Sequence, residues 1–216
     1  MIGFSSEQEL VTLFKRSYTN RFSMNNNKIL EEVGLGFGIA DIVITELKDN
    51  CLSTQRDELN SIDINIYQIV KRAKRITLET IAQKTKISRI EASKSLQKLI
   101  EFCYIREVDT YYEFSNKYEL SYKKSIAFEA KLRNWKKALL QAYRYKWFAE
   151  YSYVILDDAH SNPAIQNIDS FEKMNVGLLT ITTDGIIKEH FHPKKQKPID
   201  PSMQMLLSEF IYHSDN

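Results

Sequence analysis

The feature of this sequence that most limits its possible folds is a hydrophobic pattern that changes twice. Residues 28–48 read as strands, residues 62–102 place apolar side chains at helical spacing, and strand-like runs return after residue 126. A strand repeats its faces every two residues and a helix about every 3.6, so one segment cannot satisfy both patterns. The sequence therefore predicts an α/β domain that is interrupted along the chain by a mainly helical one.

The outer segments predict elements in a clear order. Ser6 is a candidate N-cap for a helix ending near residue 20, and strands are expected at 28–33 and 39–44. After the interruption we expect a strand at 126–132, an amphipathic helix at 133–150 and a strand at 151–156. Loop and helix at 162–173, a hairpin at 176–187 and a short helix near 201–212 complete the prediction.

The middle segment predicts three short helices followed by a hairpin. The helices begin near Ile62, after Thr77 and at Ser88, and a tight turn at residues 86–87 separates the last two. Residues 104–108 and 111–114 form a compact hairpin around Asp109-Thr110. This order resembles a winged helix-turn-helix domain. We therefore divide the 216 residues into a discontinuous core, 1–58 and 116–216, and an inserted domain, 59–115.

Composition narrows the class of protein. No run reaches the roughly 18 apolar residues of a membrane helix, so we expect a cytoplasmic protein with no membrane partner. The two cysteines are too few for a four-cysteine zinc or iron–sulfur site. The net charge of +2 hides an uneven distribution: residues 123–147 carry +7 and residues 61–115 carry +3. Clustered Lys and Arg beside aromatic residues indicate a nucleic-acid partner, although a solvated helix face has the same composition.

Two carboxylates lie inside strands that are otherwise apolar. Asp41 interrupts Gly-Ile-Ala-Asp-Ile-Val-Ile, and Glu129 is followed by Lys131 in Phe-Glu-Ala-Lys-Leu. An isolated buried carboxylate costs several kcal/mol unless a cation or hydrogen bonds compensate it. A Mg²⁺ ion held by both carboxylates is one such cause, and a structural ion pair between strands is the alternative.

These motifs resemble the PD-(D/E)XK nuclease superfamily, with a restriction-endonuclease-like mixed sheet flanked by helices. The resemblance covers residues 1–48 and 123–192 and implies a Mg²⁺ or Mn²⁺ site at Asp41 and Glu129, with Lys131 assisting water. It also implies a third ligand from the first helix, for which Glu7 is better oriented than Glu9; a favourable interaction of Glu7 with the helix dipole is the alternative.

The resemblance extends to one helix and adds candidate DNA contacts. Gln141 and Tyr145 match the Gln-x-x-x-Tyr motif of RecB-like members and could contact DNA backbone, or lie at the edge of the core stripe. The surrounding basic residues are candidate phosphate contacts, namely Arg133, Lys137 and Arg144. Five residues of the third middle helix could enter a major groove, namely Arg89, Ser93, Lys94, Gln97 and Lys98. That middle domain could instead mediate protein interaction or dimerisation.

Two functional hypotheses follow. The first is a Mg²⁺-dependent deoxyribonuclease in which the winged helix binds duplex DNA. The second is a catalytically inactive nuclease-fold protein that binds DNA or assembles in a defence, recombination or mobile-element system, as a homodimer or in a larger complex. The two hypotheses share a basic surface and differ in the chemistry expected at Asp41, Glu129 and Lys131.

Overall fold

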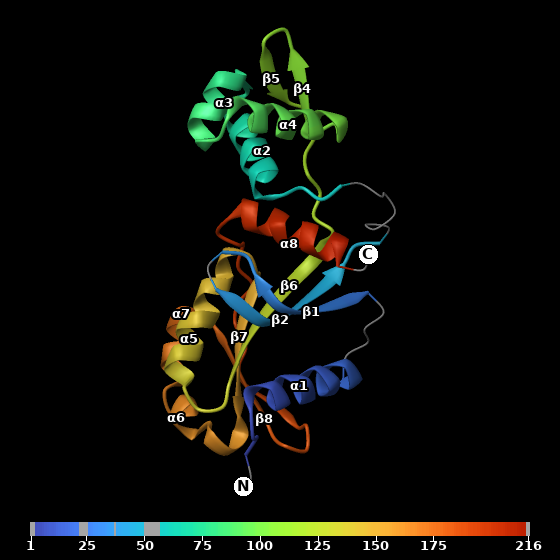
Figure 1. The fold of residues 1–216 in the computed structure, drawn as a ribbon. Helices are drawn as coiled ribbons and strands as arrows, with labels where there is room; N and C mark the ends of the chain where they lie inside the picture. The colour runs from blue at the N-terminus through green and yellow to red at the C-terminus, as the bar shows by residue number, and fades with distance from the viewer. Residues whose placement is uncertain (1–2, 22–25, 37, 50–56, 215–216) are drawn as a thin grey trace. The chain divides into compact units, whose positions relative to one another are not determined.

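The chain divides into two compact units (Figure 1). The computed structural model describes residues 3–21, 26–36, 38–49 and 57–214. Unit 1 comprises Met1–Cys51 and Tyr122–Asp200, and unit 2 comprises Leu52–Ser121 and Pro201–Asn216. Both units are therefore built from two separated stretches of chain.

Unit 1 is a six-stranded mixed sheet flanked by helices, with strand order β1-β2-β6-β7-β8-β9. The pairs β6/β7 and β7/β8 are parallel and the other pairs are antiparallel. The strands are β1 (Asn27–Gly34), β2 (Ile39–Leu47), β6 (Tyr122–Lys131), β7 (Tyr151–Asp157), β8 (Gly177–Ile181) and β9 (Ile187–Phe191). The helices are α1 (Glu7–Arg21), α5 (Trp135–Arg144), η1 (Tyr145–Trp147), η2 (Asp158–His160), α6 (Asn162–Ile165) and α7 (Ile168–Met174).

Helices cover both faces of this sheet. On one face, Phe14 of α1 packs against Phe128 of β6, with ring centroids 5.2 Å apart. On the other face, α5 buries Leu139 and Ala142 and packs against β6 and β7. Successive strand side chains point to opposite faces, so Phe128 faces α1 while its neighbour Glu129 faces α5. The predicted α/β class with a mixed sheet and flanking helices is confirmed.

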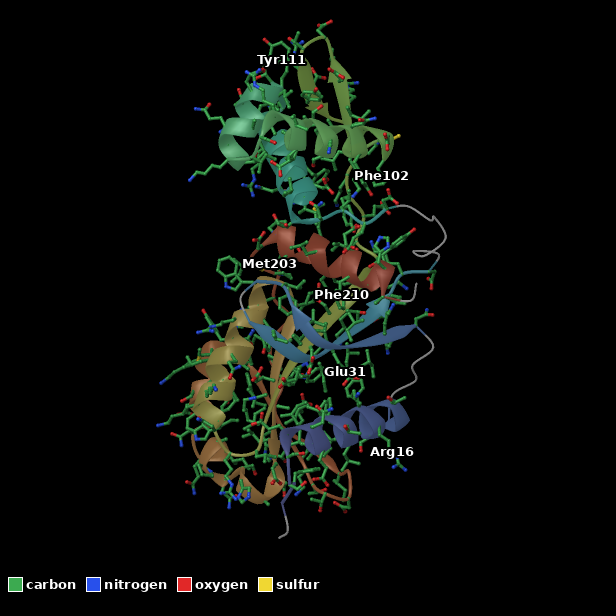
Figure 2. All side chains as sticks on the ribbon, in the orientation of Figure 1. Arg16, Glu31, Phe102, Tyr111, Met203 and Phe210 are labelled. Carbon is green, nitrogen blue, oxygen red and sulfur yellow. The ribbon has the colours of Figure 1, made fainter. Side chains whose placement is uncertain are left out.

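Helix α1 is fixed at its start and along its length. Ser6 Oγ accepts a hydrogen bond from Glu9 N at 3.1 Å, so the predicted N-cap is present. Further along, Lys15 forms an ion pair with Glu31 of β1, which is labelled in Figure 2. The cap and this ion pair orient the N-terminal turn, which carries Glu7, beside the end of β6.

In its described residues, unit 2 contains four helices and a small antiparallel sheet of order β3-β5-β4. Its elements are α2 (Ser61–Ala73), β3 (Arg75–Ile76), α3 (Leu78–Thr85), α4 (Arg89–Glu101), β4 (Ile105–Val108), β5 (Tyr111–Phe114) and α8 (Pro201–His213). The predicted caps are present, because Thr77 and Ser88 accept from Thr80 N and Glu91 N. Figure 2 labels Tyr111 on the hairpin, whose ring lies 4.3 Å from the Arg75 guanidinium carbon.

The structure differs from the predicted division of the chain at its C-terminal helix. The sequence placed residues 201–216 in the core, whereas α8 belongs to unit 2. There Leu59 N donates to Glu209 Oε2 at 2.8 Å, and Ser121 N donates to Ser208 Oγ at 2.8 Å. Apolar spacing identifies the buried face of a helix but not the partner that covers it, so the sequence could not make this assignment.

No helix among the described residues has the length and apolar content needed to cross a bilayer. The short strand β3, which the sequence did not predict, contains only two residues and pairs with β5. A strand that short carries no periodic pattern, and only its pairing partner defines it.

Candidate active site

Asp41 and Glu129 lie beside each other at the ends of two neighbouring strands. Ile42 of β2 is paired with Phe128 of β6, so Asp41 and Glu129 lie one residue beyond this pair. The Asp41 carboxylate accepts a hydrogen bond from Ala130 N at 2.7 Å, which fixes it against β6. Glu129 is 1% exposed and Asp41 is half-buried. The structure therefore brings together two carboxylates that are 88 positions apart in the sequence.

Lys131 occupies a cage of oxygen atoms at this point. Its Nζ lies 3.0 Å from Glu7 Oε2, 3.1 Å from Glu129 Oε1 and 2.9 Å from Ala130 O. Glu9 instead accepts from Ser5 at the start of α1, so Glu7 is the carboxylate of the first turn that reaches the site. Three carboxylates, Asp41 included, thus surround one ammonium group.

Burial and charge shift the proton affinities of these groups. Burial raises the pKa of Glu129, and the neighbouring charge of Asp41 raises it further. Burial also raises the pKa of Asp41, against the opposing effect of the Ala130 hydrogen bond. For Lys131, burial lowers the pKa, but Glu7 and Glu129 together outweigh it and leave the pKa raised. The negative charge of the three carboxylates exceeds the positive charge of Lys131, so the site favours a further proton or cation.

Tyr145 completes the surroundings of Glu129. Its hydroxyl lies 2.7 Å from Ile39 O and also contacts Glu129 Oε2. The Tyr145 hydroxyl donates to both acceptors, so its single hydrogen is shared between Ile39 O and Glu129 Oε2. The hydrogen bond to Glu129 lowers the pKa of this carboxyl group, against the larger effect of burial, which raises it.

The position of Tyr145 corrects its predicted role. The sequence predicted a DNA contact for Tyr145, but the side chain is 2% exposed and its hydroxyl donates to the Ile39 carbonyl group. Its position after α5 turns the ring inward, toward β6, instead of outward to solvent. Tyr145 therefore positions Glu129. The Oε1 atom of Gln141, one turn earlier, is buried and has no hydrogen-bond partner among the described residues.

The basic segment, residues 123–147, exposes only some of its positive side chains to solvent. Arg133, Lys137 and Arg144 are exposed, as a phosphate-contacting role requires. Lys146, which lies in the same +7 segment, is 9% exposed and donates to Met174 O, and burial lowers its pKa. Its contribution to the basic surface is therefore lost. Lys123 pairs with Asp49 at 3.3 Å.

Helix α4 of unit 2 exposes most of the residues proposed to enter a groove. Arg89, Ser93, Lys94 and Gln97 are exposed, and Arg89 lies 3.4 Å from Glu79. Lys98 differs, because its Nζ pairs with the buried Asp63 at 3.1 Å and also donates to Glu58 O. The predicted DNA contact of Lys98 is thus corrected to a structural ion pair. The sequence could not separate Lys94 from Lys98, since their burial depends on α2.

Within the described parts of the chain, no three His, Cys, Asp or Glu side chains are grouped closely enough to hold a metal ion. The Lys131 ammonium lies between two of the candidate ligands, Glu7 and Glu129, which accounts for their separation. The donors are nonetheless carboxylate and carbonyl oxygens, the ligands that Mg²⁺ uses, and their negative charge is in excess. The residues present therefore fit a hard divalent cation in donor type and charge, provided that Lys131 moves.

The two histidines of the β9 region lie in different surroundings. His190 Nε2 lies 3.0 Å from Thr180 Oγ1, whereas His192 Nδ1 lies 2.8 Å from Glu189 Oε1. Different partners hold the two rings.

Sequence reasoning missed the carbonyl groups of Ala130 and Ile39 and the support that Tyr145 gives to Glu129. Every residue has a backbone carbonyl group, so residue type does not show which carbonyl groups line a site.

Comparison with known protein families, with curated proteins and with solved structures gave no match to this chain.

Proposed function

We propose that this protein is a Mg²⁺-dependent nuclease that hydrolyses DNA phosphodiester bonds. The observation that carries the proposal is the cluster of Glu7, Asp41, Glu129 and Lys131, which come from α1, β2 and β6. Burial raises the pKa values of Asp41 and Glu129, and the three carboxylates exceed the positive charge of the single lysine. Such clusters of perturbed acids beside a lysine are typical of sites that act on phosphate esters with a divalent ion.

Each side chain has a distinct task in this proposal. Asp41 and Glu129 would hold Mg²⁺ or Mn²⁺, which when bound polarises the phosphate and acidifies the attacking water. Lys131, kept charged by its carboxylate partners, orients that water and offsets negative charge on the phosphate. Glu7 supports Lys131, and Tyr145 holds the Glu129 side chain in place through the Ile39 carbonyl contact.

The order of strands supports a restriction-endonuclease-like core. A first helix, two antiparallel strands and a third strand with the Glu-x-Lys triplet are followed by an amphipathic helix and a parallel strand. The same order of elements carries the resemblance to the PD-(D/E)XK superfamily. We propose that unit 1 is such a core and that unit 2 interrupts it.

We further propose that unit 2 is a winged helix that binds duplex DNA. Helices α3 and α4 meet at a tight turn in which Lys86 adopts a left-handed conformation, and the hairpin β4-β5 follows α4. The exposed side chains of α4, including Arg89 and Lys94, provide donors for a groove. The hairpin and Arg75 provide further contacts for phosphates.

A second function is favoured by one observation, the placement of the Lys131 ammonium in the oxygen cage. If this ion pair is permanent, the carboxylates are neutralised internally and the protein is an inactive nuclease-fold DNA-binding or assembly protein. The two proposals predict opposite results when divalent ions are added, because only a catalytic site exchanges the lysine for a metal.

A cleavage assay on supercoiled and linear duplex DNA with Mg²⁺ tests the proposal. Wild type is compared with Glu129→Gln and Lys131→Met, with the exposed pair Glu172→Gln and Lys173→Met as matched controls. We expect cutting by wild type and both controls, and none by the two site variants. Equal cutting by wild type and Glu129→Gln would remove this site from catalysis, and no cutting by wild type would favour the inactive alternative.

A further inference from the structure

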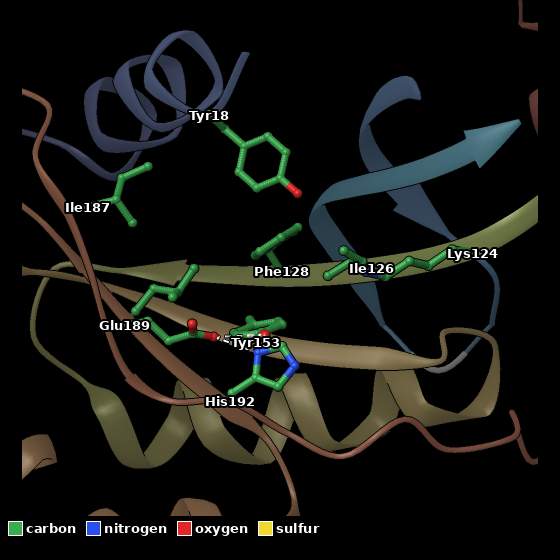
Figure 3. A pocket seen from close by; sticks show the side chains of 9 residues that line it. Tyr18, Lys124, Ile126, Phe128, Tyr153, Ile187, Glu189 and His192 are labelled. Carbon is green, nitrogen blue, oxygen red and sulfur yellow. Dashed lines mark hydrogen bonds and ion pairs between the residues drawn. The ribbon is translucent and has the colours of Figure 1, made fainter. Parts of the chain in front are cut away.

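A cavity of about 280 Å³ lies in unit 1 on the α1 face of the sheet (Figure 3). Its walls come from α1, from strands β6, β7, β8 and β9, and from the residue after β9. Phe128 lines it, and Phe128 faces away from the Glu129 carboxyl group because adjacent strand residues point to opposite faces. The cavity is therefore separate from the candidate active site. Its volume lies near the lower end of ligand pockets, about 300–1,000 Å³.

Aromatic rings form two sides of this cavity. The rings of Phe128 and Tyr153 are stacked, with centroids 5.5 Å apart and planes inclined by 22°. Tyr18 reaches from α1 toward Phe128, as Figure 3 shows. The two rings meet edge-on, with their centroids 6.2 Å apart. Flat apolar walls of this kind accept a planar aromatic group, since aromatic rings gain from stacked and edge-to-face contacts.

Polar groups gather at one side of the cavity. Glu189 Oε1 lies 3.0 Å from the Tyr153 hydroxyl and 2.8 Å from His192 Nδ1. These contacts fix the carboxylate in position, while its Oε2 has no hydrogen-bond partner among the described residues. A ring N–H or an exocyclic amino group of a bound ligand can donate to this second oxygen.

A cation lies at the other end of the lining. Lys124 of β6 lies with its Nζ 4.8 Å from the centre of the Tyr151 ring, and no carboxylate of the described chain forms an ion pair with it. Glu46, which is paired with Lys124 on the neighbouring strand β2, forms no ion pair with it either. An ammonium group without a carboxylate partner attracts an anion such as phosphate.

We propose that this cavity binds one nucleotide unit. The base lies in the cavity against the rings of Tyr18, Phe128 and Tyr153, an N–H of the base donates to Glu189, and the phosphate pairs with Lys124. Stacking, one hydrogen-bond acceptor and one cation are the three features by which proteins recognise a single nucleotide. The site goes beyond the proposed cleavage reaction and does not depend on a metal ion.

Calorimetric titration without divalent ions tests this proposal. The probes are the four deoxynucleoside monophosphates and the matching deoxynucleosides, added to wild type and to Lys124→Gln, Tyr18→Leu and Glu189→Gln. Lys173→Gln and Glu172→Gln, both exposed in unit 1, are the matched controls. Thermal unfolding of each variant verifies that it is folded before titration.

We expect Lys124→Gln to weaken monophosphate binding about tenfold and to leave nucleoside binding unchanged, because only the phosphate contact is lost. Tyr18→Leu should weaken both kinds of ligand by about five-fold or more, since the stacking wall is removed. Glu189→Gln should change the ranking of the four bases. Absence of binding to wild type at millimolar ligand, or equal affinities in wild type, Lys124→Gln and Tyr18→Leu, would overturn the proposal.

A further arm identifies the source of the nucleotide. A short single-stranded oligonucleotide that binds with the same dependence on Lys124 and Tyr18 indicates a base within a strand, whereas binding of monophosphates alone indicates a free nucleotide. All titrations are repeated with Glu129→Gln. Retained binding in a protein that cuts no DNA separates this site from the proposed nuclease, whose failure would leave the cavity proposal standing.

Discussion

Two lysines of this chain each lie 3.1 Å from a buried carboxylate, one in each unit. In unit 2, Lys98 pairs with Asp63, whose oxygens also accept from Ser95 Oγ and Asn60 N. One carboxylate and one ammonium are thus balanced, with hydrogen bonds filling the remaining positions. In unit 1, Lys131 pairs with Glu129 in the presence of further acids and an additional contact to a tyrosine.

The difference between these ion pairs lies in what surrounds them. A buried pair that is balanced and fully hydrogen-bonded holds helices together and has no need of another partner. The pair in unit 1 has Glu7 and Asp41 beside it, and burial raises the pKa of both Asp41 and Glu129. Identical ion-pair distances therefore describe a structural contact in one unit and a candidate reactive site in the other.

The largest expected effect is on DNA cleavage. Substituting Glu129→Gln or Lys131→Met should lower the cleavage rate by roughly 10²–10⁴-fold, the range for loss of a catalytic acid, base or charge-stabilising group. Asp63→Asn should leave the rate of the folded protein within about two-fold, since Asp63 lies in unit 2. Initial rates on linear DNA at saturating Mg²⁺ measure both. A comparable loss in Asp63→Asn would show that the two pairs are not functionally distinct.

The second effect concerns stability, for which the ion pair in unit 2 is expected to matter more than the ion pair in unit 1. Asp63→Ala should lower the free energy of unfolding of unit 2 by about 3–5 kcal/mol, because the Lys98 ammonium loses its buried partner. At a pH low enough to protonate Glu129, the substitution Glu129→Gln exchanges one neutral polar group for another of similar size and should change stability by less than about 1 kcal/mol. Urea denaturation followed by circular dichroism gives both values. A larger loss in Glu129→Gln would assign the unit 1 pair a structural role.

The third effect is on the pH dependence of stability. Because burial raises the pKa of Glu129 and Asp41, the folded state binds their protons more tightly than the unfolded chain does. Their contribution to stability is present below the unfolded pKa of about 4 and is lost as pH rises through the raised folded values. Mg²⁺ competes with these protons, so the Mg²⁺-induced rise in Tm should grow from pH 5 to pH 8.

Thermal unfolding with and without 10 mM Mg²⁺, roughly tenfold above a weak site's affinity, measures this dependence. Glu129→Gln should flatten it, and Asp63→Asn should not. A Mg²⁺ effect that is independent of pH in wild type would place the ion elsewhere.

The smallest effect separates two lysines on one helix. Lys94→Met should weaken duplex DNA binding and reduce the slope of log K against log salt by about one, since an exposed phosphate contact is lost. Lys98→Met should leave that slope unchanged and lower the stability of unit 2, because Lys98 is engaged with Asp63. Fluorescence anisotropy across a salt series distinguishes them. Equal slopes for the two variants would contradict DNA binding by α4.

Local structure was largely predictable from the sequence. Ser6, Thr77 and Ser88 begin helices where their capping chemistry predicts, and the strands that carry Asp41 and Glu129 lie where alternating and continuous apolar runs place them. These features depend on neighbours within a few residues, whose identities a single sequence displays. The site residues Asp41, Glu129 and Lys131 were found because a buried charge in an apolar strand demands a partner.

Contacts between distant segments required the tertiary structure. Tyr145 is 16 residues from Glu129, Lys98 is 35 from Asp63, and α8 joins unit 2 although it follows unit 1 in the chain. In each case the residue type allows either an exposed or a buried role. The sequence by itself determined which segments become helices and strands and where charge is buried. The tertiary structure decided which partner each side chain meets, because burial and pairing energies depend on groups that lie close only after folding.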